Sequence, residues 1–361
     1  MQLIVGSYRE ATNRGIHLYD WCGSDQTFKP TGGISGIENP SYIWIAPQAP
    51  LLYAISEDKE GSAGKISIYE LQLNDGEATL LSSIPFEAAG SCFISTDDAG
   101  RHAFIANYES GSLTVVQLPA DGITGGVVQQ FKFIGNGPDP KRQEQPHLHA
   151  ALLSRDERFL YCSDLGTDHL YRFLYQPEDP LPLQANLHSY IKLPSGCGPR
   201  HLTFSPDGRW LYLITELSAE LFVFDMAEPD NNWLQQIAIN PSGYSGKIEG
   251  GDVQVDVTGR FLYASNRGDA NEIVVFKIKP LTGKLQFRQR ISTAGLSPRS
   301  ILICEQCGLL LAANEQSDNV VIFKIQHNGS LELTPNQLHI PAPTCVKTVN
   351  NRINSTKNQI L

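Results

Sequence analysis

The chain has 361 residues and a formal net charge of −10, with 41% hydrophobic and 18% charged residues. This balance supplies enough apolar material for a core and too little charge for a disordered chain. Nucleic acids and anionic membranes attract basic surfaces, so neither is expected as a partner of this acidic protein.

The N-terminal segment Met1–Tyr8 is predicted to be a short strand. It carries neither the basic region nor the long apolar stretch of a signal peptide, so export is not expected. No apolar run approaches the roughly 20 residues that a transmembrane helix needs. The seven cysteines are scattered, and an odd number favours reduced thiols. We therefore expect a soluble, cytoplasmic protein.

One pattern then recurs six times along the chain. It consists of an apolar strand, a turn rich in Asp, Gly or Pro, and a second strand of the type Phe/Leu-Leu-Tyr-Ala. A third strand usually follows after a turn with Gly, Asp or Ser, so each copy is predicted to be an antiparallel meander. The six copies lie at 42–57, 93–108, 150–165, 201–216, 252–267 and 300–315.

The residues that close these turns stand at positions 50, 101, 158, 209, 260 and 308, about 50 residues apart. This spacing is typical of a four-stranded propeller blade. The C-terminal segment 343–349 has the pattern of an innermost strand, which the N-terminal copy lacks. We predict an all-β, seven-bladed β-propeller over residues 1–361, closed by pairing of the two terminal strands in one blade. An open β-solenoid is the alternative.

Two columns of the repeat are predicted to ring one mouth of the central channel. The start of an inner strand and the end of the second strand lie on one edge of an antiparallel pair. Neither column is apolar. The first contains Ser41, Cys92, His149, Arg200, Gly251 and Arg299, with Thr344 as its equivalent in the last blade, and the second contains Glu57, Tyr108, Leu165, Glu216, Arg267 and Glu315.

The charges in these columns indicate a site for a small anion. Placing opposite charges at a narrow mouth costs desolvation free energy. Packing alone would not need charged residues there, which favours a ligand site. Arg200, Arg267 and Arg299 are suited to carboxylate or phosphate groups, which guanidinium groups bind bidentately. The alternative is that the charges only pair with one another and fasten neighbouring blades.

No metal or other cofactor is predicted. His147 and His149 point the same way along a strand, but no matching carboxylate column accompanies them. Cys304 and Cys307 have the spacing of a zinc or redox pair, but the chain has no second pair and the repeat places them in a hairpin turn. Residues assigned to substrate binding are Arg299, His147, His201, Glu57 and Tyr108.

Eight short segments carry a resemblance to a known family. They are Val5-Gly-Ser-Tyr8, Gly15-Ile-His-Leu-Tyr19, Glu38-Asn-Pro-Ser-Tyr42, Pro146-His-Leu-His149, Asp164-Leu-Gly-Thr-Asp168, Gly198-Pro-Arg-His201, Ala264-Ser-Asn-Arg-Gly268 and Cys345-Val-Lys347. In order and sequence they resemble the lactonase propellers that include bacterial 6-phosphogluconolactonase, with the fungal carboxymuconate-lactonizing enzyme as a more distant relative. The catalytic residues of the fungal enzyme would correspond to His149, Arg200, Glu216 and Arg267.

The resemblance implies hydrolysis of a sugar lactone, first of all 6-phospho-D-glucono-1,5-lactone to 6-phosphogluconate in the pentose phosphate pathway. Glu216 or His149 is expected to act as the base. Arg200 and Arg267 are expected to orient the anion or stabilise the oxyanion, and Arg299 to hold the phosphate. A muconate-type cycloisomerase in the same site and a non-catalytic propeller that binds a small anion or a protein are the alternatives. The sequence also leaves a homo-oligomer open.

Overall fold

The structure is a computed structural model that describes residues 1–10, 12–23, 27–57, 63–72, 76–119, 125–184, 189–228 and 233–349. Within these residues the strands form seven antiparallel sheets, and the single helix is the short 3-10 helix η1 (Glu315–Ser317). No helix in these ranges is long and apolar enough to cross a membrane.

Six of the sheets are built from consecutive segments, and in each the first strand is innermost. The first sheet consists of β4 (Pro40–Ile45), β5 (Leu51–Ser56), β6 (Gly64–Gln72) and β7 (Glu77–Phe86). The second consists of β8 (Ser91–Thr96), β9 (His102–Asn107), β10 (Ser112–Gln117) and β11 (Gly126–Lys132). The third consists of β12 (Leu148–Leu153), β13 (Phe159–Asp164), β14 (His169–Tyr175) and β15 (Leu183–Gln184), with β16 (Tyr190–Lys192) also paired to β14. The next three consist of β17 (Pro199–Phe204), β18 (Trp210–Thr215), β19 (Glu220–Asp225) and β20 (Gln235–Ala238); β21 (Gly250–Val255), β22 (Phe261–Asn266), β23 (Glu272–Ile278) and β24 (Leu285–Ser292); and β25 (Pro298–Cys304), β26 (Leu309–Asn314), β27 (Asn319–Ile325) and β28 (Leu331–His339).

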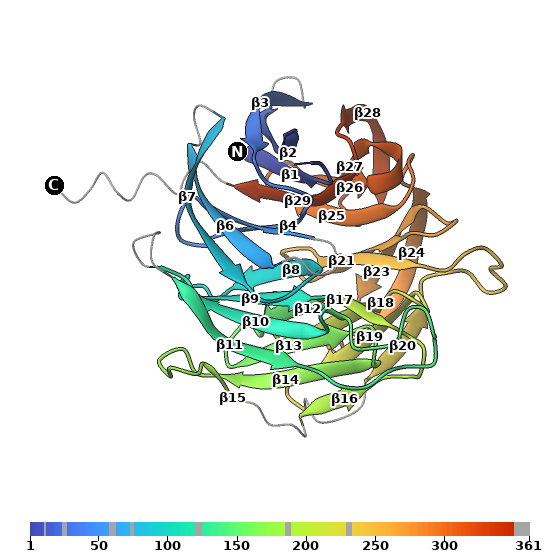
Figure 1. The fold of residues 1–361 in the computed structure, drawn as a ribbon. Coiled ribbons are helices and arrows are strands. Elements are labelled where there is room, and N and C mark those ends of the chain that lie inside the picture. The colour runs from blue at the N-terminus through green and yellow to red at the C-terminus, as the bar shows by residue number, and fades with distance from the viewer. Residues whose placement is uncertain are drawn as a thin grey trace.

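The seventh sheet joins the two ends of the chain. Its innermost strand β29 (Pro343–Val349) pairs with β1 (Gln2–Ser7), which is followed by β2 (Arg14–Cys22) and β3 (Thr27–Ser35). Figure 1 shows β29, in red, beside the blue N-terminal strands. The inner strands contact one another in the order β4, β8, β12, β17, β21, β25, β29 and back to β4. The predicted seven-bladed propeller and its closure are therefore confirmed, and the open solenoid is wrong.

The middle strands are buried on both faces because each blade packs between two others. All six residues of β9 and of β22 are buried, whereas the outer strands β7 and β11 are largely exposed or half-buried. Full burial of a side chain such as Phe104 or Ile105 contributes about 1.5–3 kcal/mol. This core fixes the inner strands, whose first residues form the mouth of the channel.

Every inner strand has a register shift at its beginning. In the blade that contains β4 and β5, Pro40 pairs with Ser56 but Tyr42 pairs with Ile55, so Ser41 is an extra residue. Such β-bulges change the direction of a side chain and are frequent beside functional sites. The other six shifts include Cys92, His149, Arg200, Gly251, Arg299 and Thr344, which together with Ser41 are the first predicted column.

Candidate active site

The second predicted column lies at the same mouth, held there by one repeated hydrogen bond. The backbone N–H of Glu216 donates to Gly198 O at 2.7 Å, and that of Arg267 donates to Glu249 O at 2.7 Å. Gly198 has a φ of +62°, and a side chain there would meet Leu217, so glycine suits this position. The equivalent bond in the other five blades is donated by Tyr8, Glu57, Tyr108, Leu165 and Glu315.

Glu216 is the centre of a group of charged side chains, the Glu216 cluster, which consists of Glu216, Arg142, Arg200, Arg267 and His149. Glu216 Oε2 lies 2.9 Å from Arg200 Nε and 2.6 Å from Arg267 Nη2. Arg142 Nη2 donates to Glu216 Oε1, and His149 Nε2 lies 3.7 Å from Glu216 Oε2. The side chain of Arg142 is 38% exposed, whereas the other four are buried.

Backbone carbonyls fix the two buried arginines. Arg200 Nη1 donates to Gly251 O at 2.8 Å. Arg267 donates from Nε and Nη2 to Gly250 O at 3.1 and 3.0 Å. Both carbonyls belong to the bulged beginning of β21. Arg200 and Arg267 are thus tied to the protein, and Arg142 is the guanidinium of this cluster with substantial exposed surface.

The Glu216 cluster has an excess of positive charge. Three guanidinium groups face one buried carboxylate, and the partly exposed Glu249 lies 3.5 Å from Arg267 Nη2. Burial opposes the charge of Glu216, but Arg267 and Arg200 outweigh it and hold its pKa well below the usual value. Burial and Arg267 lower the pKa of Arg200 to about 10, so it stays cationic at neutral pH. Glu216 is therefore a persistent anion and a weak base.

His149 is a neutral imidazole at neutral pH. Burial and the positive charge of Arg200 lower its pKa well below 6.5. Its Nδ1 lies 3.9 Å from Cys92 Sγ, and its ring packs edge-on against Tyr108 with centroids 5.6 Å apart. An unprotonated imidazole accepts a proton from water, and an adjacent carboxylate such as Glu216 stabilises the imidazolium that results.

A second polar group at this mouth surrounds Arg299. Its Nη2 lies 3.4 Å from Glu57 Oε2 and its Nη1 lies 3.8 Å from Glu315 Oε2, while Tyr8 donates its hydroxyl to Glu57. Burial opposes the charge of Arg299, but Tyr8, Glu57 and Glu315 outweigh it and raise its pKa. Two carboxylates compensate Arg299, so the positive excess lies in the Glu216 cluster.

Tyr108 and His147 border the Glu216 cluster. Tyr108 Oη accepts from Arg142 Nη2 at 3.3 Å, and its ring stacks on His147 at 4.2 Å between centroids. The nitrogens of His147 lie 3.0 Å from Tyr108 O and 3.1 Å from Glu144 Oε1, so they serve the loop and not Glu216. Among the described residues, no three His, Cys, Asp or Glu side chains are placed to share one metal ion.

His201, expected to bind the same ligand, lies one layer deeper in the channel. Its Nδ1 is 2.8 Å from Asp252 Oδ1, and its ring contacts His149 with centroids 5.3 Å apart. It lines a cavity that Glu216 and the three arginines do not line. The assignment of His201 to the anion site stays a prediction, and the structure gives it a contact with His149 but none with Glu216 or the three arginines among the described interactions.

The repeat does not point to Arg142 or Tyr8. Arg142 lies in the connection 133–147 between β11 and β12, outside both columns, where buried Gln143 bonds to Leu165 O and Asp168 Oδ1 at 2.8 Å each. The available signal is the length of this connection, since long loops in compact domains are often functional. Tyr8 is the seventh member of the second column. The repeat does not reveal this, because the inner strand of its blade does not precede it in the sequence but comes from the C-terminal end.

Comparisons with known proteins agree over nearly the whole chain. A family model described as "Lactonase, 7-bladed beta-propeller" matches residues 2–348. The 6-phosphogluconolactonase of Bacillus subtilis (strain 168) is 30% identical over 346 residues, which cover 95% of this chain and 97% of the relative. The 6-phosphogluconolactonase of Formosa agariphila is 28% identical over 342 residues, 93% of this chain and 96% of the relative. The structure of a periplasmic gluconolactonase from Pseudomonas aeruginosa superimposes with a TM-score of 0.90 at 32% identity, covering 96% of this chain and 98% of that one.

Proposed function

Because the chain belongs to the family of seven-bladed lactonase propellers, we propose that it hydrolyses a sugar lactone at the Glu216 cluster. The observation that carries this proposal is a neutral buried imidazole beside a persistent carboxylate, within a group that has excess positive charge. Opening an ester requires a base for the attacking water and positive groups for the developing oxyanion. His149 and the arginines meet these two requirements.

His149 is the base in this mechanism. Its imidazole takes a proton from a water molecule while the water oxygen bonds to C1 of the lactone, and the carbonyl electrons move onto the carbonyl oxygen. The bond between C1 and the ring oxygen then breaks, and the imidazolium returns the proton to that oxygen to give the open hydroxy acid. Glu216 is too stabilised as an anion to compete as a base, and it favours the imidazolium instead.

The three arginines have different roles because their exposure differs. Arg200 is 1% exposed, so it is a positioning residue that holds Glu216. Arg267 is 6% exposed and uses Nε and Nη2 for Gly250 O and Glu216, so we propose that its Nη1 stabilises the oxyanion. Arg142, 38% exposed, binds a phosphate or another anionic substituent of the substrate at the rim. We therefore propose Arg142 as the phosphate-binding residue in place of Arg299, because two carboxylates already compensate the charge of Arg299.

We propose 6-phospho-D-glucono-1,5-lactone as the substrate, since two relatives carry the name of the enzyme that opens it and Arg142 offers a cation to its phosphate. Glucono-1,5-lactone is a second candidate, because the Pseudomonas relative is named a gluconolactonase. The two substrates share the ring chemistry and differ in the phosphate alone.

The proposal is tested by turnover of three compounds by the purified protein at pH 7. Acid release from 6-phosphogluconolactone and gluconolactone is compared with the rate in buffer, and loss of muconate absorbance reports the cycloisomerase alternative. We expect both lactones to open faster than in buffer, with the larger kcat/KM for the phosphorylated one. Turnover of muconate alone would favour the cycloisomerase, and turnover of none of the three would favour a non-catalytic propeller.

A further inference from the structure

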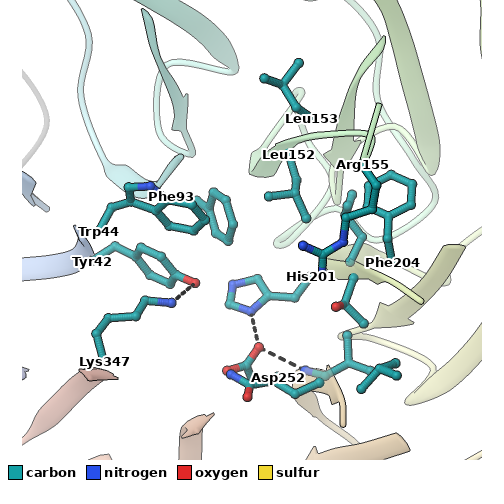
Figure 2. A pocket seen from close by; sticks show the side chains of 15 residues that line it. Tyr42, Trp44, Phe93, Leu152, Leu153, Arg155, His201, Phe204, Asp252 and Lys347 are labelled. Carbon is teal, nitrogen blue, oxygen red and sulfur yellow. Dashed lines mark hydrogen bonds and ion pairs between the residues drawn. The ribbon is translucent and has the colours of Figure 1, made fainter. Parts of the chain in front are cut away.

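A cavity of about 280 Å³ is lined by residues from the middle and the far ends of the inner strands, and Figure 2 shows its lining side chains. The inner strands run from one mouth to the other, with Arg200 near the beginning of β17 and Phe204 at its end. Phe204 lines the cavity, as do Trp44 and Val255 from the far halves of β4 and β21. No member of the Glu216 cluster lines the cavity, so it is distinct from the site proposed for hydrolysis, although its lining residue His201 contacts His149 with centroids 5.3 Å apart.

One wall of this cavity is aromatic. Tyr42, Trp44 and Phe93 line it, and the rings of Tyr42 and Phe93 are 4.5 Å apart between centroids. Figure 2 shows His201 and Asp252 beside these rings, and the His201 ring packs edge-on against Phe93 and Tyr42 with centroids 5.4 and 6.0 Å apart. Flat aromatic surfaces of this kind pack well against the C–H face of a small ligand.

Lys347 places a positive charge against this wall. Its Nζ donates to Tyr42 Oη at 3.2 Å and lies 4.7 Å from the centroid of the Tyr42 ring and 5.4 Å from that of Trp44. Among the described residues, no carboxylate forms an ion pair with Lys347. The ammonium group is held by neutral partners, so it can still pair with an anion.

Asp252 forms no ion pair with Lys347, although their charges attract each other and this attraction helps to lower the pKa of Asp252; protein donors occupy both carboxylate oxygens. Oδ1 accepts from His201 Nδ1 at 2.8 Å and from Val253 N at 2.9 Å. Oδ2 accepts from Ile301 N at 3.0 Å and from Ser300 Oγ at 3.3 Å. Asp252 thus orients His201, and both of its oxygens already accept hydrogen bonds from protein donors.

His201 offers the cavity a hydrogen-bond acceptor. Because Nδ1 donates to Asp252, the proton of the neutral ring is on Nδ1 and Nε2 carries a lone pair. Burial and Arg200 lower the pKa of His201 to about 4, so this tautomer persists at neutral pH. An acceptor of this kind pairs with a hydroxyl group, and Lys347, bonded to the neighbouring Tyr42, supplies an ammonium group to the same cavity.

We propose that this cavity is a second ligand site, which binds a small hydroxylated carboxylate with its carboxylate on Lys347, a hydroxyl on His201 Nε2 and its C–H face on Tyr42 and Trp44. Its volume of about 280 Å³ is just below the roughly 300–1,000 Å³ found for ligand pockets, so only a small ligand fits. The ligand is therefore about the size of a six-carbon sugar acid. The proposal needs no turnover and no residue of the Glu216 cluster.

The test is a titration with D-gluconate at pH 7, followed by tryptophan emission. We expect a saturable change that is lost in Trp44→Phe, which assigns the signal to this cavity. Lys347→Met should weaken the apparent affinity at least tenfold, Lys347→Arg should restore it to within about threefold, and Lys279→Met, an exposed control, should leave it unchanged. Unfolding midpoints of all four variants show whether they are folded.

An unchanged gluconate affinity in folded Lys347→Met overturns the proposal, and so does the absence of any emission change in the wild-type protein. Because binding is measured without turnover, these outcomes are independent of whether the protein opens lactones. If Lys347→Met does not fold, the comparison of Lys347→Arg with His201→Phe takes its place, and equal affinities of the two would also overturn the site.

Discussion

Replacing Glu216 with Gln tests the energetic role of the buried carboxylate. The change keeps the shape of the side chain but leaves Arg142, Arg200 and Arg267 without their shared anion. Removing one partner of a buried ion pair costs about 3–5 kcal/mol, because the remaining charges stay buried and uncompensated. Domains are stable by roughly 5–15 kcal/mol, so the variant should fold but unfold at a much lower denaturant concentration.

The matched control is Glu315→Gln, in the same column of the repeat. Glu315 is 23% exposed and lies 3.8 Å from Arg299, so its loss should cost less than about 1 kcal/mol. Urea unfolding of both variants and the wild type, followed by far-ultraviolet circular dichroism, gives the three midpoints. A Glu216→Gln midpoint no lower than that of Glu315→Gln would show that the Glu216 carboxylate does not stabilise the folded protein.

The effect of Glu216 should also depend on pH. Its pKa is depressed in the folded protein, so its stabilising contribution is fully present above the unfolded pKa of about 4.3. That contribution is lost as the pH falls through the folded pKa. The gap in midpoint between wild type and Glu216→Gln should therefore be constant at neutral pH and shrink in acid solution.

Three other outcomes follow from the site and the fold. The kcat/KM for lactone opening should be level above pH 6.5 and fall at lower pH, since the pKa of the base His149 lies well below 6.5; a fall that begins near pH 8 would contradict this. Arg142→Ala should raise KM for 6-phosphogluconolactone about tenfold or more and hardly change that for gluconolactone, whereas Lys141→Ala, an exposed neighbour, should alter neither. Val346→Asp puts a charge at a fully buried position of β29, whereas Val127→Asp puts one at a position of β11 that is 42% exposed. The first should lower the melting temperature far more than the second. Equal melting temperatures would argue against ring closure as a source of stability.

The fold and both columns were predictable because they follow from a period. A blade repeats every 50 residues or so, and hairpin turns fix which residue begins each inner strand. His149, Arg200, Glu216 and Arg267 were found in this way, and the structure brings them together around one carboxylate.

The remaining site residues were not accessible to the same reasoning. Arg142 reaches Glu216 from an irregular loop, whose path depends on tertiary contacts such as those of Gln143. The direction of His201 depends on the bulge of β17, where the pairing register shifts between Pro199 and Leu202. A period of two along the strand cannot tell which way a residue at such a bulge points.

The most direct test of the central claim is the kcat/KM of His149→Gln for 6-phosphogluconolactone, beside His339→Gln, an exposed control on β28. If His149 takes the proton from water, its loss should lower kcat/KM about 10²–10⁴-fold, while the control matches the wild type. A folded His149→Gln protein that opens the lactone within about threefold of the wild-type rate would contradict the account.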